Sequence, residues 1–393
     1  LNSVTATKTD TPLLNVAQSV NVITREQLDD QALHSLGDVL HYVPGTTVGQ
    51  GEGNRDQVTL RGQNTTADFF LDGVRDDTQY FRGLYNVERV EVLKGPYALI
   101  FGRGGGGGII NRVQKTPSAG GAFASGRVSA NSFGAWDVSA DANTPVSDMA
   151  AFRINAVYEN LDNHRDAFEG ERYAVNPHVA MDFGTGWRAG LSYEYVNDDR
   201  VVDRGIPSLN GAPLTGYRDQ FFGVPGVNRT TLKAHITKLR IDGALADNVE
   251  ASTTILYGDY DKVYTNVYAS GPATAQGGTV PLGVYASPTT RQNLLVQSNL
   301  VWDVTTGGMD HKVLFGLEYG DQDSANQRRS ATLSSPSLDL ANPVFPTVTF
   351  TTLSRNTVST VESVSAYVQD QIHLGEQVQI VAGLRYDRFD ITG

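Results

Sequence analysis

The chain has no cysteine among its 393 residues, so it carries neither a disulfide framework nor a thiolate metal site. Charged residues are scarce at 19%, and the net charge of −12 is the opposite of the basic surface that a general nucleic-acid binder needs. The sequence also lacks an apolar run of the roughly 18–20 residues that a membrane-spanning helix requires. A closed β-barrel, whose strands leave only a weak hydropathy signal, remains as a way to cross a membrane.

Catalytic motifs are missing as well. No GxSxG, HExxH or P-loop sequence occurs, so we expect no enzyme and no protein-bound cofactor or metal. Two acidic pairs, Asp76-Asp77 and Asp198-Asp199, offer oxygen ligands of the kind that calcium takes. Because both pairs lie in loop-like segments, solvated surface charge is the simpler interpretation.

Glycine (41 residues) and tyrosine (17 residues) are plentiful, a balance that suits turns and half-buried strands. From about residue 123 onward apolar and polar residues alternate, which predicts strands with one apolar face, about eleven of them. Tight turns are expected near 147–148, 184–186, 247–248, 307–308 and 375–376, and mostly long connections near 161–171, 197–230, 262–290 and 322–358. Short connections on one rim and long ones on the other are typical of an outer-membrane barrel, which we favour over a soluble β-sandwich.

The first 120 residues have a different pattern. A strand over residues 15–23 precedes Thr24 and Ser35, whose spacing to later polar residues predicts the caps of two short helices. Four further strand-like runs, at 58–62, 67–71, 87–93 and 109–113, predict a small mixed four-stranded sheet. The expected fold class is therefore mainly β, with a small α+β domain over residues 1–120 and a β-barrel segment over 121–393.

Residues 87–117 form the most informative stretch of the chain. A strand ends in a break at 94–96, and a glycine-rich segment leads into a second strand. Gly102, Gly104 and Gly107 satisfy the GxGxxG pattern of dinucleotide-binding proteins, but that pattern must open a helix, and a strand follows here. The glycines are better explained by a backbone that lies close against another surface.

Several segments of this region follow a known family pattern. They read DQVTLRG (56–62), FLDGV (70–74), ERVEVLKGP (88–96), LIFGRGGGGGIIN (99–111) and KTP (115–117). In sequence and order they resemble the plug domain of TonB-dependent outer-membrane receptors, and the resemblance covers roughly residues 15–117. It implies a plug inside an antiparallel transmembrane β-barrel of roughly 22 strands, of which about eleven are present here. We therefore expect the chain to be part of a larger receptor, and the TonB-contacting segment expected upstream of residue 1 is not recognisable.

The resemblance also implies a function. It predicts import of a ferric siderophore across the bacterial outer membrane, driven by TonB with its inner-membrane motor, by a monomer embedded in outer-membrane lipid. Iron would be carried within the siderophore, so no resident cofactor is expected, and no nucleic acid takes part. The glycine run is most similar to that of catecholate siderophore receptors. Cobalamin, haem or saccharide import, a passive outer-membrane porin and a soluble enzyme are the alternatives.

Two plug loops, residues 49–57 and 74–86, are expected to face the outer vestibule on this topology. Arginine and tyrosine suit anionic aromatic chelates through charge-assisted hydrogen bonds, cation–π contacts and stacking. The candidate ligand-binding residues are Arg55, Arg75, Tyr80, Phe81, Arg82 and Tyr85.

A second group of charged residues is expected to form ion pairs that hold the plug to the barrel wall or close the plug sheet. Its members are Arg61, Glu88, Arg89 and Glu91. The glycine run predicts one further effect: Gly106→Val should disturb the folding or seating of the plug before it alters ligand affinity.

Overall fold

The computed structural model describes residues 2–3, 5, 7–9, 11–16, 18–95, 98–104, 106–375 and 377–393. Pro96 of the break at 94–96, Gly105 of the glycine run and Glu376 of the last expected turn lie outside the described residues.

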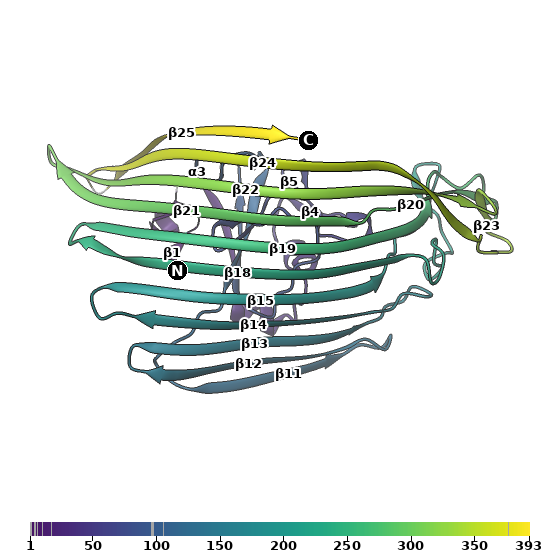
Figure 1. Cartoon of the computed structure of the whole chain (residues 1–393), viewed down its shortest axis with the longest axis horizontal. Helices are drawn as coiled ribbons and strands as arrows, with labels where there is room; N and C mark the ends of the chain where they lie inside the picture. Colours follow the sequence, from purple (N-terminus) through teal and green to yellow (C-terminus); the bar gives the residue numbers. More distant parts are fainter. Residues whose placement is uncertain are drawn as a thin grey trace.

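The second part of the chain forms one large antiparallel sheet, here called the wall (Figure 1). Eleven long strands follow one another in chain order, in agreement with the predicted number. They are β11 (Phe123–Ala130), β12 (Trp136–Ser147), β13 (Ala150–Leu161), β14 (Gly170–Asp182), β15 (Trp187–Val201), β18 (Arg229–Ala246), β19 (Val249–Ala269), β21 (Thr289–Thr306), β22 (Met309–Leu333), β24 (Val348–Leu374) and β25 (Val378–Thr392). Two short strands, β20 (Thr279–Ala286) and β23 (Ser337–Asp339), extend this sheet at one end.

The two rims of the wall differ as predicted. The five predicted tight turns follow β12, β14, β18, β21 and β24 and so share one rim, the short-turn rim, while the longest connections lie on the opposite long-loop rim. Gly307 and Gly308 both have positive φ, 59° and 82°, which is the conformation of a type I′ hairpin turn.

The expected loops at 262–290 and 322–358 were partly wrong, because much of this chain is strand. β19 continues to Ala269, β22 to Leu333, and β24 begins at Val348. Beyond the wall these segments still pair with β20 and with each other, so their backbone groups are satisfied. In β22 beyond Gln322 and in β24 before Thr360 no side chain is buried, so the alternating pattern fades there and a search by periodicity misses these strands.

The plug contains a mixed sheet, but it has five strands instead of four. The strand order is β3 (Ser19–Thr24), β9 (Val87–Lys94), β10 (Gly108–Gln114), β7 (Phe69–Leu71) and β8 (Val74–Arg75), and only β10 and β7 are parallel. The run at 58–60 belongs to a separate sheet formed by β4 (Thr46–Val48), β5 (Val58–Leu60) and β6 (Gln63–Thr65). Arg61 and Gly62 have φ of 47° and 84°, so the chain turns back on itself there instead of joining the larger sheet.

The helices of the plug begin where the caps predicted. The Thr24 side chain accepts a hydrogen bond from the backbone N–H of Gln27 at the start of α1 (Arg25–Asp30), and Ser35 and Asp38 form a capping box at α2 (Leu36–His41). Within the described residues, no helix is long and apolar enough to cross a membrane. The remaining short elements are β1 (Asn2–Ser3), β2 (Thr11–Pro12), η1 (Leu13–Asn15), η2 (Gly51–Gly53), α3 (Ala98–Phe101), β16 (Ser208–Leu209) and β17 (Ala212–Pro213).

The glycine run is close-packed only in part. A Cβ on Gly107 would lie 2.2 Å from the carbonyl oxygen of Leu60, and one on Gly108 would lie 2.2 Å from that of Leu93. A Cβ on Gly106 would meet nothing within 4 Å. The expected sensitivity of the run is therefore assigned to Gly107 and Gly108, and the choice of Gly106 was wrong.

The plug lies against one face of the wall (Figure 1), and part of this contact is an apolar surface, here called the packed side. Buried side chains of the plug and of β14 to β19 form one cluster there: Leu71, Val74, Tyr80, Ala174, Val196, Leu232, Ala234, Ile236, Leu256 and Tyr260. A second cluster joins the plug to β22 and β24 through Leu314 and Tyr367. Burial of these side chains is the main favourable term that seats the plug.

Candidate functional site

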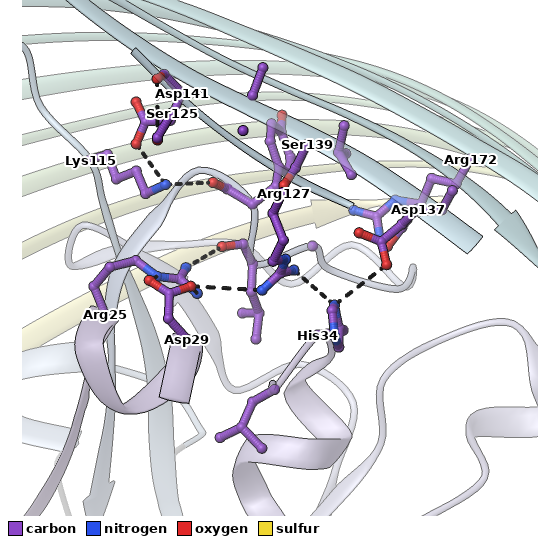
Figure 2. A pocket seen from close by; sticks show the side chains of 18 of the residues that line it. Arg25, Asp29, His34, Lys115, Ser125, Arg127, Asp137, Ser139, Asp141 and Arg172 are labelled. Carbon is purple, nitrogen blue, oxygen red and sulfur yellow. Dashed lines mark hydrogen bonds and ion pairs between the residues drawn. The ribbon is translucent and has the colours of Figure 1, made fainter. Parts of the chain in front are cut away.

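A cavity of about 410 Å³ separates the plug from the first strands of the wall (Figure 2). We call it the lateral cavity. Side chains from α1, from the segment after it and from β11 to β14 line it. Arg127 of the wall lies 2.9 Å from Nδ1 of His34 and 3.7 Å from Asp29, both on the plug. Lys115, where the plug leads into the wall, forms a 2.9 Å ion pair with Asp141.

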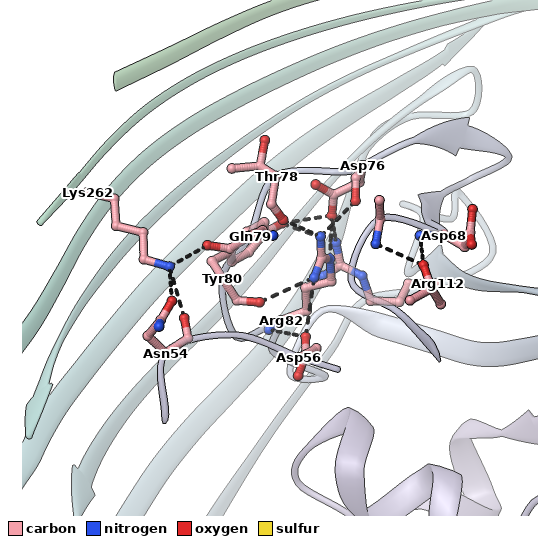
Figure 3. Close-up of polar contacts among 12 residues, drawn as sticks. Asn54, Asp56, Asp68, Asp76, Thr78, Gln79, Tyr80, Arg82, Arg112 and Lys262 are labelled. Atoms are coloured by element: carbon pink, nitrogen blue, oxygen red, sulfur yellow. Dashed lines mark hydrogen bonds and ion pairs between the residues drawn. The ribbon is translucent and has the colours of Figure 1, made fainter. Parts of the chain in front are cut away.

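A buried group of charges lies inside the plug near the long-loop rim, and we call it the apical ion cluster (Figure 3). One carboxylate oxygen of Asp76 accepts hydrogen bonds from Arg82 Nε at 2.9 Å, from Arg112 at 2.7 Å and from the Tyr80 hydroxyl at 2.9 Å. Arg82 also donates to the carbonyl oxygens of Asp76 and Thr78 at 2.7 and 2.6 Å. These contacts fix the shape of the loop that follows β8.

Burial and charge act against each other in this cluster. Burial alone would raise the pKa of Asp76, but the guanidinium groups of Arg82 and Arg112 hold it below its ordinary value. Burial by itself would lower the pKa of Arg82, and Asp76 raises it above its ordinary value. Burial also raises the pKa of Tyr80. All four groups therefore keep the charge states in which they bind one another at neutral pH.

Two of the predicted ligand-binding residues belong to this cluster. The side chain of Arg82 is fully buried and Tyr80 is 3% exposed, so neither presents surface to the vestibule. The structure corrects their expected role: they hold the apical loop together. The Arg75 guanidinium is also bound within the plug, because it donates to the carbonyl oxygens of Phe101 and Arg103 at 2.8 and 2.5 Å.

The other three candidates lie nearer to the wall. Arg55 forms a 3.0 Å ion pair with Glu52. Arg200 of the wall stacks on the Phe81 ring, with its guanidinium carbon 4.7 Å from the ring centroid. The remaining candidate, Tyr85, donates to Glu194 of the wall at 3.0 Å. Ligand contact by Arg55, Phe81 and Tyr85 stays a prediction.

A lysine of the wall joins the two plug loops that were expected to face outward. Lys262 of β19 donates to the carbonyl oxygen of Asn54 at 3.1 Å, to its side-chain oxygen at 2.5 Å and to the carbonyl oxygen of Gln79 at 2.6 Å (Figure 3). Asn54 lies in the first loop and Gln79 in the second. Both loops are therefore tied to the same strand of the wall.

Stacked aromatic and basic side chains lie at the long-loop rim above these loops, and we call them the outer aromatic group. Its members are Arg204, Tyr264, Tyr268, Tyr285 and Arg328. The Arg328 guanidinium lies 3.7 Å from the Tyr285 ring centroid and that of Arg204 lies 4.2 Å from the Tyr268 centroid. The tyrosine rings pack edge to face at 5.6 and 5.9 Å. Sequence analysis missed this group, because four separate segments of the chain contribute to it: the loop after β15, β19, β20 and β22.

The predicted plug–wall ion pairs were assigned to the wrong residues. Arg89 pairs with Glu91 at 2.7 Å, but both lie on β9 inside the plug, where Asn111 of β10 also donates to Glu91. These two therefore fit only the alternative role, closing the plug sheet. Arg61 and Glu88 are exposed and form no ion pair with any described residue of the wall. Glu88 lies on the face of β9 opposite to Arg89 and Glu91, and Arg61 lies in the turn after β5.

Other charges connect plug and wall. Lys8 pairs with Glu318 at 2.7 Å, Asp77 with Arg291 at 2.6 Å, and Asp72 with Lys238. Burial would raise the pKa of Asp72, but Lys238 holds it below its ordinary value. The partners are separated by up to 310 residues, and no local pattern marks them.

Metal binding by the acidic pairs has no support in the described part of the chain, where no group of three potential ligands gathers. Asp198 pairs with Arg200, and Asp199 pairs with Arg229 at 2.6 Å. Their charge is thus compensated by neighbouring arginines.

Comparison with known proteins gives two family matches. Residues 12–109 match the TonB-dependent receptor plug domain, and residues 181–393, more than half of the chain, match the TonB-dependent receptor-like β-barrel. The chain is 27% identical to the probable TonB-dependent siderophore receptor PiuA of Acinetobacter baumannii, with 96% of this chain and 55% of PiuA covered. It is 26% identical to the catecholate siderophore receptor Fiu of Escherichia coli, with 96% and 53% covered.

A third relative differs in its ligand. The metal-pseudopaline receptor CntO of Pseudomonas aeruginosa is 28% identical, with 98% of this chain and 56% of CntO covered. The crystal structure of PiuA superposes with a TM-score of 0.89 at 25% identity and covers 100% of this chain and 60% of that structure. The chain thus spans about half the length of the curated relatives it matches.

Proposed function

The chain belongs to the family of TonB-dependent receptors, located in the outer membrane, and on this premise we propose that it takes part in the import of an anionic ferric siderophore. The long-loop rim faces the outside in this proposal, and the plug closes the path until the ligand has bound. TonB and the inner-membrane motor supply the energy. Iron is the cargo inside the chelate and is not a resident cofactor.

The observation that supports this ligand class is the outer aromatic group. Arg328 stacks on Tyr285 and forms no ion pair with any described carboxylate, so its positive charge is balanced only by the ring face. An anionic aromatic chelate offers what this pair lacks, a negative charge for the guanidinium and a second ring for stacking. The names of the relatives PiuA and Fiu agree with a siderophore, and that of CntO keeps the range of chelates wide.

A binding screen tests the proposal. The receptor in detergent is titrated with ferric tris-catecholate, ferric hydroxamate, haem, cobalamin and a maltooligosaccharide, and quenching of intrinsic fluorescence reports binding. We expect saturable quenching by a ferric chelate, and about tenfold weaker binding by Arg328→Gln, which corresponds to about 1.4 kcal/mol. The matched control is Arg188→Gln, because Arg188 is exposed at the short-turn rim and, among the described carboxylates, pairs with Asp182 alone.

Two results contradict the proposal. One is the absence of quenching by every ferric chelate, with haem, cobalamin or the saccharide binding instead. The other is an equal loss of affinity in the Arg328 and Arg188 variants, which would place the ligand away from the outer aromatic group.

A further inference from the structure

The lateral cavity is lined mainly by charged side chains, whereas the neighbouring strands β14 to β19 meet the plug through an apolar cluster. Five basic side chains and four carboxylates line it, together with His34. The basic residues are Arg25, Lys115, Arg127, Arg153 and Arg172, and the acidic ones are Asp29, Asp137, Asp141 and Glu159. Figure 2 shows that they come from both sides of the space, from the plug helix α1 and from the inner face of the wall.

Several polar atoms in this boundary are buried but have no hydrogen-bond partner among the described residues. They are Nε of Arg127, Nε of Arg172 and one carboxylate oxygen of Asp137. Buried polar atoms of this kind are satisfied by water where the space is large enough. The cavity is large enough at about 410 Å³, so we treat it as hydrated.

The strands of the wall explain why the cavity forms here. On β12 the side chains that face the plug are polar and short, namely Asp137, Ser139 and Asp141. On β18 the side chains of Leu232, Ala234 and Ile236 face the plug in an apolar cluster, and the next inward residue, Lys238, binds Asp72 of the plug. A plug that moves off β12 exchanges hydrated charge contacts for water, whereas one that moves off β18 exposes apolar surface.

The gap between plug and wall narrows at one end of the cavity. The backbone of Gly83 lies so close to the wall that a Cβ there would be 2.0 Å from a guanidinium nitrogen of Arg172. Arg172 therefore rests on bare backbone and pairs with Glu159 of its own sheet at 3.1 Å. At this end of the cavity the wall therefore touches the plug through Arg172 and the backbone of Gly83, and this contact is not an ion pair.

We infer that the lateral cavity is the start of the path by which the ligand passes the plug, and that the packed side stays in contact during transport. Its volume lies within the roughly 300–1,000 Å³ of small-molecule pockets, so partial movement of the plug widens it enough for a chelate. The five basic side chains exchange their carboxylate partners for an anionic ligand as it passes. The inference rests on the proposed function, since it places the path of that same import.

Introduced cysteines test the inference, and the absence of native cysteine makes each new thiol the only one in this sequence. Ser139→Cys places a thiol in the lateral cavity with almost no change in size. Ala234→Cys is the matched variant on the packed side, where Ala234 is fully buried. Cells that express either receptor are treated with a small hydrophilic methanethiosulfonate and with a bulky maleimide, with and without ferric chelate and an active TonB system.

At rest the thiol at position 139 should react with the small reagent, and the one at 234 should not. During energised transport labelling of position 139 should accelerate at least fivefold, while position 234 stays protected. A bulky adduct at 139 should lower uptake of radioactive iron at least tenfold and leave chelate binding at the cell surface unchanged, which also shows that the variant is folded.

Other outcomes overturn the inference. Faster labelling at 234 during transport, alone or together with 139, would mean that the packed side opens or that the whole plug leaves. Unchanged uptake with a bulky adduct at 139 would place the path elsewhere. If the unmodified receptor neither binds nor imports any ferric chelate, the proposed function fails, while resting reactivity at 139 and protection at 234 still report on the cavity itself.

Discussion

The two sides of the plug meet the same wall through different chemistry. On the packed side apolar residues of β18 and β19 interlock with Leu71, Val74 and Tyr80 of the plug. On the side of the lateral cavity, charged residues face each other across a space of about 410 Å³. Apolar contact seats the plug firmly because separation exposes its surface to water, whereas an exposed plug–wall pair such as Arg127 with Asp29 separates at little cost. These two kinds of contact fit the inference that the plug stays in place at the packed side and moves at the lateral cavity.

The largest effect is expected inside the plug, in the apical ion cluster that shapes its outer loop. Asp76→Asn removes the carboxylate shared by Arg82 and Arg112, which leaves the buried Arg112 without this partner and Arg82 with Asp56 alone. We expect a loss of about 3–5 kcal/mol of plug stability, measured by hydrogen exchange of plug amides. The control is Asp29→Asn, whose side chain is 54% exposed, with an expected change of about 0–1 kcal/mol. Equal protection in both variants would show that the cluster does not hold the loop.

The next prediction compares the loss of stability on the packed side with that at the lateral cavity. Leu232→Ala on the packed side should lower the stability of the receptor by about 2–5 kcal/mol, because it leaves a hole in a close-packed cluster. Ser139→Ala in the lateral cavity should change it by less than about 0.5 kcal/mol, since that side chain is half-exposed. Thermal unfolding in detergent measures both. Similar losses in the two variants would remove the distinction between the sides.

A smaller loss of stability is expected from substitutions in the glycine run of the plug. Gly107→Ala forces a Cβ against the carbonyl oxygen of Leu60 and should cost about 1–3 kcal/mol. Gly106→Ala has open space and should lie within about 0.5 kcal/mol of the parent protein. Thermal unfolding of the two variants side by side decides between them, and a larger loss at Gly106 would contradict the packing described here.

A change of pH within the physiological range is expected to have the smallest effect on the stability of the plug. The pKa values of Asp72 and Asp76 are lower in the folded plug than in the unfolded chain. The stability from these two groups is therefore fully present above the unfolded value of about 3.9 and is lost as pH falls through the lower folded values. We expect the unfolding temperature of the plug to stay constant between pH 7 and 5 where only these groups matter, and to fall below about pH 4. In the Asp72→Asn variant the unfolding temperature should fall less steeply below about pH 4. An unchanged fall would exclude the contact of Asp72 with Lys238 as its source.

Much of the fold could be predicted because its signals are local. Alternating residues give the wall strands, Gly307-Gly308 gives a hairpin turn, and Thr24 and Ser35 give the helix caps. The assignment of residues 58–60 to the main plug sheet failed, because the turn at Arg61 decides the pairing and propensity alone does not show it.

The site was harder to predict because its parts come together only in three dimensions. Arginine and tyrosine in a loop suggest ligand contact, yet Arg82 and Tyr80 are turned inward by Asp76. The plug–wall pairs, such as Lys8 with Glu318, join distant segments and leave no trace in spacing. The residue types thus indicated which kinds of contact the chain can form, and the tertiary fold decides which residues form them.

Tethering each side of the plug in turn examines the difference between them most directly. A short bismaleimide joins His34→Cys to Asp137→Cys across the lateral cavity, where the native side chains are 3.9 Å apart, or Asp72→Cys to Lys238→Cys at the other side. Uptake of radioactive ferric chelate is measured before and after cross-linking. We predict that the tether across the lateral cavity lowers uptake at least tenfold and that the tether at Asp72 and Lys238 leaves more than half of it. The reverse order, or equal loss with both tethers, would contradict a plug that opens on the side of the lateral cavity.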